Sequence, residues 1–92
     1  MQEQNKLVVF EDKKIRRIWY KEEWYFSVVD IVRVLTESKD AKDYWYRLKQ
    51  REFESSKIEL STLCRQLKLI AEDGKLRETD CANTKSLFRI IQ

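Results

Sequence analysis

The chain contains a single glycine and no proline, and that glycine follows an aspartate at Asp73-Gly74. Short β-prone runs flank this pair, at residues 67–70 and 76–79. An Asp-Gly pair between such runs is the strongest short-range signal for a β-hairpin, because a type I′ turn needs positive φ at both of its central residues. The sequence therefore predicts a tight hairpin with a type I′ turn at Asp73-Gly74.

Two-residue alternation of β-branched and aromatic residues dominates the N-terminal part of the chain. Five short segments are expected to follow one another as strand, turn, strand, turn and strand, at residues 7–10, 11–14, 15–20, 21–23 and 24–26. This alternation predicts an antiparallel three-stranded meander. Residues 1–6 contain no apolar run, and we expect them to form a flexible N-terminus.

Helical spacing of apolar residues marks the segments that follow the meander. Ser27 is placed to cap a helix over residues 28–36, with Asp30 in the capping-box position three residues later. A second helix is predicted from about Asp40 to about Phe53. The apolar side chains that these two helices are expected to turn inward are Val28, Ile31, Val32, Leu35, Ala41, Tyr44, Trp45 and Leu48.

Two further helices complete the predicted order of elements. Residues 58–65 are compatible with a short helix that turns Leu60, Leu63 and Cys64 inward. Asn83 or Thr84 is placed to cap a last helix, which carries the apolar residues Leu87, Phe88, Ile90 and Ile91. The sum is a single α+β domain over residues 1–92: an N-terminal antiparallel three-stranded meander, two to three helices, an Asp-Gly β-hairpin and a C-terminal helix. Because the last helix is apolar on more than one face, we expect either a homodimer through it or its burial against the meander.

The amino-acid composition argues against most classes of enzyme. The 92 residues include no histidine, which is the commonest general base and metal ligand. The two cysteines, Cys64 and Cys81, lack the CxxC spacing of a zinc site, and no glycine-rich phosphate loop is possible with one glycine. Adjacent carboxylates such as Glu22-Glu23 fall in predicted turns, where solvated acids are normal. The sequence therefore predicts no catalytic residue, no metal site and no cofactor.

Apolar residues never form a run of the roughly 18 needed to span a bilayer. We therefore expect no membrane association and a cytoplasmic location, in which both thiols stay reduced.

Basic residues are more informative, although 19 lysines and arginines against 16 acids leave a net charge of only +3. Cations interleaved with aromatic residues suit phosphate contact and base stacking. On this basis the residues expected to bind nucleic acid are Arg16, Arg17, Lys42, Tyr46, Arg47, Lys49, Arg51, Lys68, Lys75 and Arg77. The alternative is a solvated surface on which these cations pair with nearby acids.

The segment over residues 18–31, which reads IWYKEEWYFSVVDI, resembles the opening of the Bro-N domain of baculovirus BRO proteins and bacteriophage antirepressors. Residues 66–69, 79–82 and 87–91 are also similar to prophage members of that family. Family members often carry glycine in the turn that corresponds to residues 21–23, so this turn is expected to be longer or differently shaped here. The resemblance implies DNA binding and transcriptional regulation in phage or prophage biology, within a longer protein that has a variable C-terminal domain.

Two functional hypotheses follow. The first is the DNA-binding domain of a prophage antirepressor-like regulator, which contacts duplex DNA through a lysine and arginine patch in a bacterial cell. The second is a protein-interaction module that binds and sequesters a phage repressor without touching DNA. A contiguous surface of lysine and arginine would favour the first, and exposed aromatics with few cations would favour the second.

Overall fold

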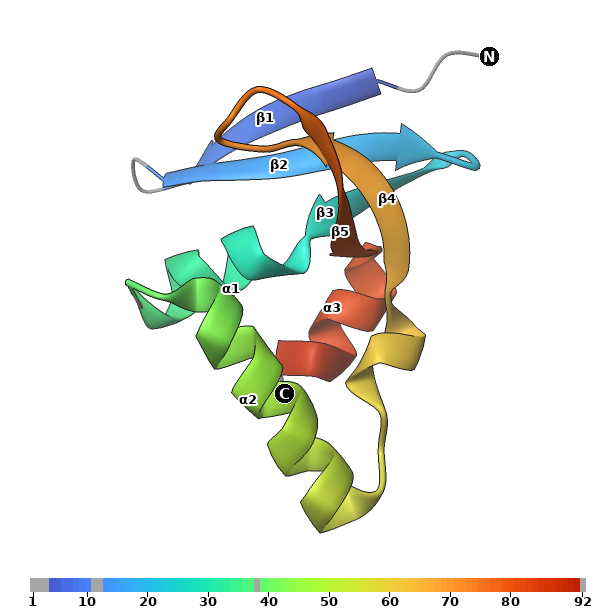
Figure 1. Cartoon of the computed structure of the whole chain (residues 1–92). Helices are drawn as coiled ribbons and strands as arrows, with labels where there is room; N and C mark the ends of the chain where they lie inside the picture. The colour runs from blue at the N-terminus through green and yellow to red at the C-terminus, as the bar shows by residue number, and fades with distance from the viewer. Residues whose placement is uncertain (1–3, 11–12, 38, 92) are drawn as a thin grey trace.

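The computed structural model describes residues 4–10, 13–37 and 39–91 (Figure 1). Its strands are β1 (Gln4–Phe10), β2 (Lys13–Tyr20), β3 (Glu23–Ser27), β4 (Arg65–Ile70) and β5 (Leu76–Ala82). Its helices are α1 (Val28–Thr36), α2 (Ala41–Ser56), the 3₁₀ helix η1 (Leu60–Leu63) and α3 (Thr84–Ile91). The α+β class is confirmed.

Over the described residues, the strands form one antiparallel sheet in the order β1-β2-β3-β5-β4. The three strands of the predicted meander, β1, β2 and β3, are neighbours, but they belong to a larger sheet. Strand β5 continues it by pairing with β3, where Phe26 faces Ala82 and Ser27 faces Cys81. Short-range alternation predicts neighbouring strands, but it carries no information on a pairing between segments more than 50 residues apart.

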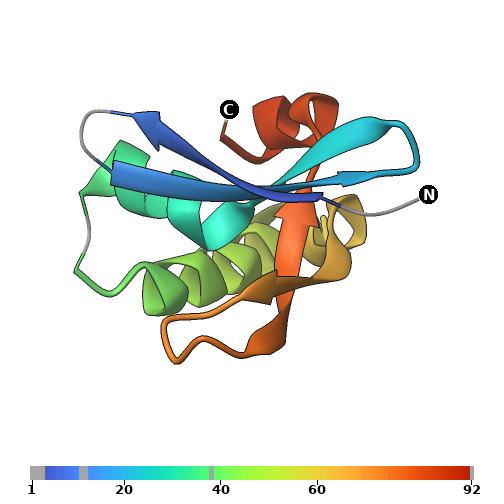
Figure 2. The ribbon, with the colours of Figure 1, turned by 90° about the horizontal axis from the view of Figure 1, so that it is seen from above.

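The sheet curls, so that its two ends approach each other. The hairpin of β4 and β5 arches back toward β1 and β2 (Figure 1), and the carbonyl of Ile70 at the end of β4 accepts a hydrogen bond of 3.1 Å from Arg16 on β2. Seen from above, β1 and β2 lie across the helices (Figure 2). This curl brings β2, α1, α2 and the hairpin around one hollow.

The N-terminal strand begins earlier than the sequence indicated. Gln4–Lys6 belong to β1 and pair with β2, which corrects the expectation that they are part of a flexible terminus. Residues 1–3 lie outside the described residues, as do residues 11–12 of the turn predicted over 11–14.

The type I′ turn lies between β2 and β3, and not at Asp73-Gly74 where the sequence predicted it. Between β2 and β3, Lys21 and Glu22 both have positive φ, at 48° and 65°, and Tyr20 pairs with Glu23. This is a two-residue hairpin loop of type I′, so the first of the two expected alternatives, a longer turn, is wrong. Pairing of the flanking strands imposes a left-handed backbone on two residues that do not favour it.

Residues 71–75 connect β4 to β5, and the pair formed by Ala71 and Lys75 encloses a loop of three residues rather than two. The amide of Gly74 donates to the carbonyl of Ala71 at 2.9 Å, and the amide of Ala71 donates to the carbonyl of Lys75 at 2.8 Å. Gly74 has a φ of 81°, whereas Asp73 is not among the described residues with positive φ. The hairpin at Asp73-Gly74 is confirmed, but its turn is a type I turn followed by a left-handed glycine.

Side-chain caps fix the starts of the α-helices near the predicted positions. The Ser27 hydroxyl accepts from the Asp30 amide at 3.3 Å, Asp40 accepts from the Asp43 amide, and Asn83 accepts from the Ser86 amide. Helix 28–36 is confirmed. Helix α2 runs three residues past the expected end at Phe53. The predicted helix over 58–65 is reduced to the four residues of η1.

The core consists of two clusters of buried residues. One lies among the helices and the end of β5, and it contains Val28, Val29, Val32, Ala41, Trp45, Leu60, Ala82 and Ile90. The other lies inside the curl of the sheet, and it contains Ile18, Tyr25, Leu67, Leu69 and Cys81. The two clusters adjoin at the C-terminal end of β5, where Cys81 belongs to one and Ala82 to the other.

Two residues expected in the core are exposed instead. Leu35 is 56% exposed, and its neighbour Val34 is the residue of the last turn of α1 that is buried. Tyr44 is 40% exposed because it lies at the edge of the arc of α2 that Ala41 and Trp45 define.

Helix α3 is covered on one side. It packs against β3, β5 and η1 with Ile90 buried, which agrees with burial against the meander. Phe88 and Ile91 remain exposed, and the homodimer stays a prediction. No helix within the described residues is both long enough and apolar enough to cross a membrane.

Candidate nucleic-acid interface

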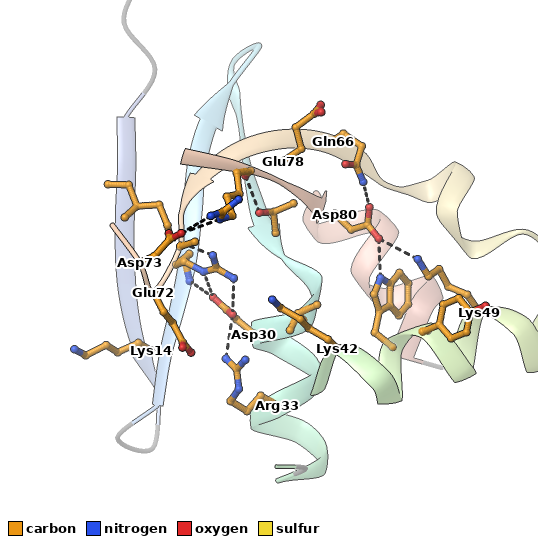
Figure 3. A pocket seen from close by; sticks show the side chains of 18 residues that line it. Lys14, Asp30, Arg33, Lys42, Lys49, Gln66, Glu72, Asp73, Glu78 and Asp80 are labelled. Carbon is orange, nitrogen blue, oxygen red and sulfur yellow. Dashed lines mark hydrogen bonds and ion pairs between the residues drawn. The ribbon is translucent and has the colours of Figure 1, made fainter. Parts of the chain in front are cut away.

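A cleft of about 950 Å³ opens between β2 and helices α1 and α2 on one side and the β4–β5 hairpin on the other (Figure 3). This is at the upper end of the range of roughly 300–1,000 Å³ typical of binding pockets. The curl of the sheet creates the cleft, because it holds the hairpin over the helices without filling the space between them.

The two walls of the cleft carry opposite charge. The wall formed by β2 and the helices has one carboxylate, Asp30, and five cations: Lys14, Arg16, Arg33, Lys42 and Lys49. The hairpin wall has one cation, Arg77, and four carboxylates: Glu72, Asp73, Glu78 and Asp80. The net charge of the whole chain, +3, does not reveal this difference between the walls. The excess of cations gives the helix wall a local positive potential.

Asp30 organises one end of the cleft. Its carboxylate accepts from Arg16 Nε at 2.8 Å, Arg16 Nη2 at 3.0 Å and Arg33 Nη1 at 3.2 Å, as well as from the Arg16 amide at 2.9 Å. Burial favours a higher pKa for Asp30, but the Arg16 hydrogen bonds and the charges of Arg16 and Arg33 hold the pKa below its usual range. Asp30 is therefore a buried carboxylate that stays ionised.

Asp80 organises the other end. Its carboxylate accepts from Trp45 Nε1 at 2.8 Å and Lys49 Nζ at 3.2 Å, and also from the side-chain amide nitrogen Nε2 of Gln66. The Lys49 ammonium also lies 5.1 Å from the centre of the Trp45 ring. These contacts attach α2 to the hairpin at the second end of the cleft.

Between these two ends, α2 presents groups that are free to meet a ligand. Lys42 is exposed, makes no ion pair within the described part of the chain, and points into the cleft (Figure 3). Tyr46, one turn later, is 56% exposed, and its hydroxyl accepts from Gln50 at 3.0 Å. An unpaired lysine beside an exposed aromatic ring is an arrangement that suits a phosphate and an adjacent base.

Of the ten residues predicted to bind nucleic acid, the structure brings five together in the cleft: Arg16, Lys42, Tyr46, Lys49 and Arg77. The structure corrects the expectation for Arg16. Its guanidinium is bound to Asp30, Ser27 and the Ile70 carbonyl, so few of its N–H groups remain for a phosphate. Arg77 is paired with Asp73, and its hydrogen bonds hold the pKa of that carboxyl below its usual range.

The other five lie outside the cleft. Arg17 stacks on Trp24, with its guanidinium carbon 3.9 Å from the ring centre, and its buried Nε has no hydrogen-bond partner in the described structure. Arg47 pairs with Asp43 at 2.8 Å. The remaining three are exposed and do not line the cleft: Arg51, Lys68 and Lys75.

Two cations of the helix wall, Lys14 and Arg33, were not predicted. Arg33 lies three residues after Asp30 on the predicted helix, so its i,i+3 spacing was a signal that could have identified it. Lys14 lies at the start of β2, in a segment predicted as a turn, and no local pattern marks it.

No cluster of three or more potential metal ligands occurs in the described ranges. Both cysteines are free thiols: Cys64 is half-buried, and Cys81 is buried. Burial raises the pKa of each thiol to about 12, so neither is poised as a nucleophile.

Comparison with known proteins gave no match to this chain among protein-family models, curated proteins or solved structures.

Proposed function

We propose that this chain is a DNA-binding domain that contacts phosphates through the helix wall of the cleft. The observation that carries the proposal is the division of charge between the walls, with five cations on the side of β2, α1 and α2. Lys42, Tyr46 and Lys49 lie on neighbouring turns of α2, so two cations flank one exposed aromatic ring. Helix α2 is rigidly attached through Trp45, which lets the patch act as a preformed surface.

The small net charge agrees with this local arrangement. With a net charge of +3, long-range attraction to DNA is modest, and affinity must arise at a patch. The carboxylates of the hairpin wall repel phosphates, so they favour phosphate contact with the helix wall. The charge on the two walls therefore determines which wall a phosphate contacts.

The more specific part of the proposal is a role in transcriptional regulation by a phage or prophage antirepressor. It rests on the resemblance of residues 18–31 to the Bro-N domain. In that role the domain holds the protein on DNA in the cytoplasm of a bacterial cell, and a further segment of a longer protein engages the repressor.

A charge reversal at Lys42 tests the proposal. Lys42→Glu is measured against Lys85→Glu, which makes the same change of net charge on α3, outside the cleft. Binding of a labelled random-sequence duplex is followed by fluorescence polarisation. We expect Lys42→Glu to weaken binding to all duplexes alike and to reduce the salt slope by about 1, while Lys85→Glu stays near wild type. Equal effects of the two variants would contradict a localised site.

One observation favours the second hypothesis, a module that binds a repressor protein. Tyr46 and Phe53 are both exposed and flank a smaller hollow of about 220 Å³, which Leu60 also lines. Exposed aromatic anchors beside a pocket are typical of protein interfaces. If no duplex binds at low salt, this surface becomes the better candidate, and Phe53→Ala would abolish capture of the repressor.

A further inference from the structure

The cleft is bridged at both ends. At one end, Arg16 spans from Asp30 on α1 to the Ile70 carbonyl on the hairpin, at 2.8 and 3.1 Å. At the other end, Asp80 on the hairpin accepts from Trp45 and Lys49 of α2. A continuous strand cannot pass along the floor of such a cleft. A single projecting group can enter it from the open side.

The cations of the helix wall between the two bridges are suited to an anion, whereas the carboxylates of the hairpin wall lie across the cleft from them. Lys42 points into this space without an ion-pair partner in the described structure. Arg33 has a side chain that is 39% exposed, and one nitrogen of its guanidinium contacts Asp30 at 3.2 Å. Arg16 alone supplies three hydrogen bonds to Asp30, so this carboxylate stays satisfied when Arg33 turns away from it. Arg33 is therefore an available cation, whereas Arg16 is not.

We propose that Arg33 and Lys42 form a seat for a phosphomonoester, carried either by the end of a nucleic-acid strand or by a free mononucleotide. This inference rests on the proposed function only for the strand end. A monoester carries a charge of about −1.5 to −2 at pH 7 and three acceptor oxygens. It matches one guanidinium and one ammonium better than an internal phosphodiester, which carries a single charge and two flanking chains. The exposed ring of Tyr46, one turn beyond Lys42, lies where a terminal base can stack.

The test compares the binding affinity of ligands that differ only in a 5′-phosphate. The same oligonucleotide duplex, with and without a 5′-phosphate, is titrated by fluorescence polarisation, and a mononucleotide monophosphate is titrated by NMR chemical shift. We expect the phosphorylated end to bind about tenfold more tightly, as one or two additional charge-assisted hydrogen bonds imply. This preference is expected to diminish below pH about 6, where the monoester gains a proton.

Two variants separate the seat from a structural effect. Arg33→Gln and Lys42→Gln each remove the preference for phosphate while leaving the urea unfolding midpoint close to wild type, and Arg33→Lys restores part of it. Lys68→Gln, an exposed cation outside the cleft, is the matched control and leaves the preference unchanged.

The outcomes distinguish this inference from the proposed function. Equal binding of phosphorylated and unphosphorylated duplexes would overturn the seat and leave DNA binding intact. Binding of the mononucleotide without binding of any duplex would support the seat for free nucleotides and overturn DNA binding. Absence of binding by every probe would overturn both.

Discussion

The side chain of Arg16 on β2 reaches Asp30 on α1 through two hydrogen bonds of 2.8 and 3.0 Å, and the Arg16 backbone amide donates a third at 2.9 Å. The two residues are 14 positions apart, and the Asp30 side chain is 3% exposed. Because the same guanidinium also reaches the Ile70 carbonyl, this pair connects β2, α1 and the hairpin. It connects the helix wall to the hairpin at one end of the cleft.

Asp30→Ala is expected to lower the free energy of unfolding by about 3–5 kcal/mol, because it leaves the partly buried Arg16 without its counter-charge. Arg33→Ala, which removes only the partly exposed partner of the same carboxylate, is expected to cost less than about 1 kcal/mol. Urea denaturation of both variants measures the difference. Similar losses for the two would show that Arg16 does not dominate the cluster.

Stability is also expected to fall in acid because of Asp30. The folded-state pKa of Asp30 lies below its unfolded value of roughly 3.9, so the ionised form stabilises the fold. That contribution is fully present above the unfolded pKa and is lost as the pH falls through the folded pKa. Thermal unfolding at a series of pH values below about 5 is expected to show a steeper decline for wild type than for Asp30→Asn. Parallel curves for the two proteins would assign the acid sensitivity to other carboxyls.

Replacing the turn residues Lys21-Glu22 by Asn-Gly is expected to stabilise the protein by about 1–2 kcal/mol, because both positions have positive φ. Gly74→Ala serves as the opposite case: its φ of 81° disfavours a side chain, and a loss of about 1 kcal/mol is expected. The urea midpoint at constant m value reports both changes. A destabilised Asn-Gly variant would argue against a type I′ turn between β2 and β3.

The cysteines are expected to resist alkylation in the folded state. Burial raises the pKa of Cys64 and Cys81 to about 12, so almost no thiolate exists at pH 8. Iodoacetamide labelling followed by mass spectrometry is expected to be slower by more than about tenfold than in urea. Because both folded-state pKa values are raised, stability is retained below the unfolded pKa of about 8.5 and declines as the pH rises toward 12. Rapid labelling of the folded protein would show that the thiols are accessible.

Local signals in the sequence were sufficient for most elements and insufficient for the way they assemble. Ser27 and Asn83 identify helix starts because a cap acts within three residues of itself. The type I′ turn was predicted at Asp73 and is found at Lys21-Glu22, since strand pairing outweighs the intrinsic preference of the turn residues. The pairing of β3 with β5 had no local signal at all.

For the candidate site, too, the sequence predicted the position of residues within one element but not the contacts between elements. Helical spacing correctly placed Lys42, Tyr46 and Lys49 on one side of α2. Arg16 was predicted to be available, but its partner Asp30 lies on another element, and spacing within β2 cannot reveal that pairing. Asp30 was interpreted as half of a capping box, although its carboxylate is occupied by arginines. Which cations are free depends on tertiary contacts, and only the fold identifies those.

The most direct test of the account is the salt dependence of binding to a random-sequence duplex. If the three helix-wall cations that are not held by the bridges, Lys14, Arg33 and Lys42, engage about three phosphates, log K is expected to fall with log[salt] at a slope near −3. Lys42→Glu is expected to flatten that slope for every duplex tested. A duplex that fails to bind at low salt, or an affinity that does not change with salt, would contradict DNA binding by this domain.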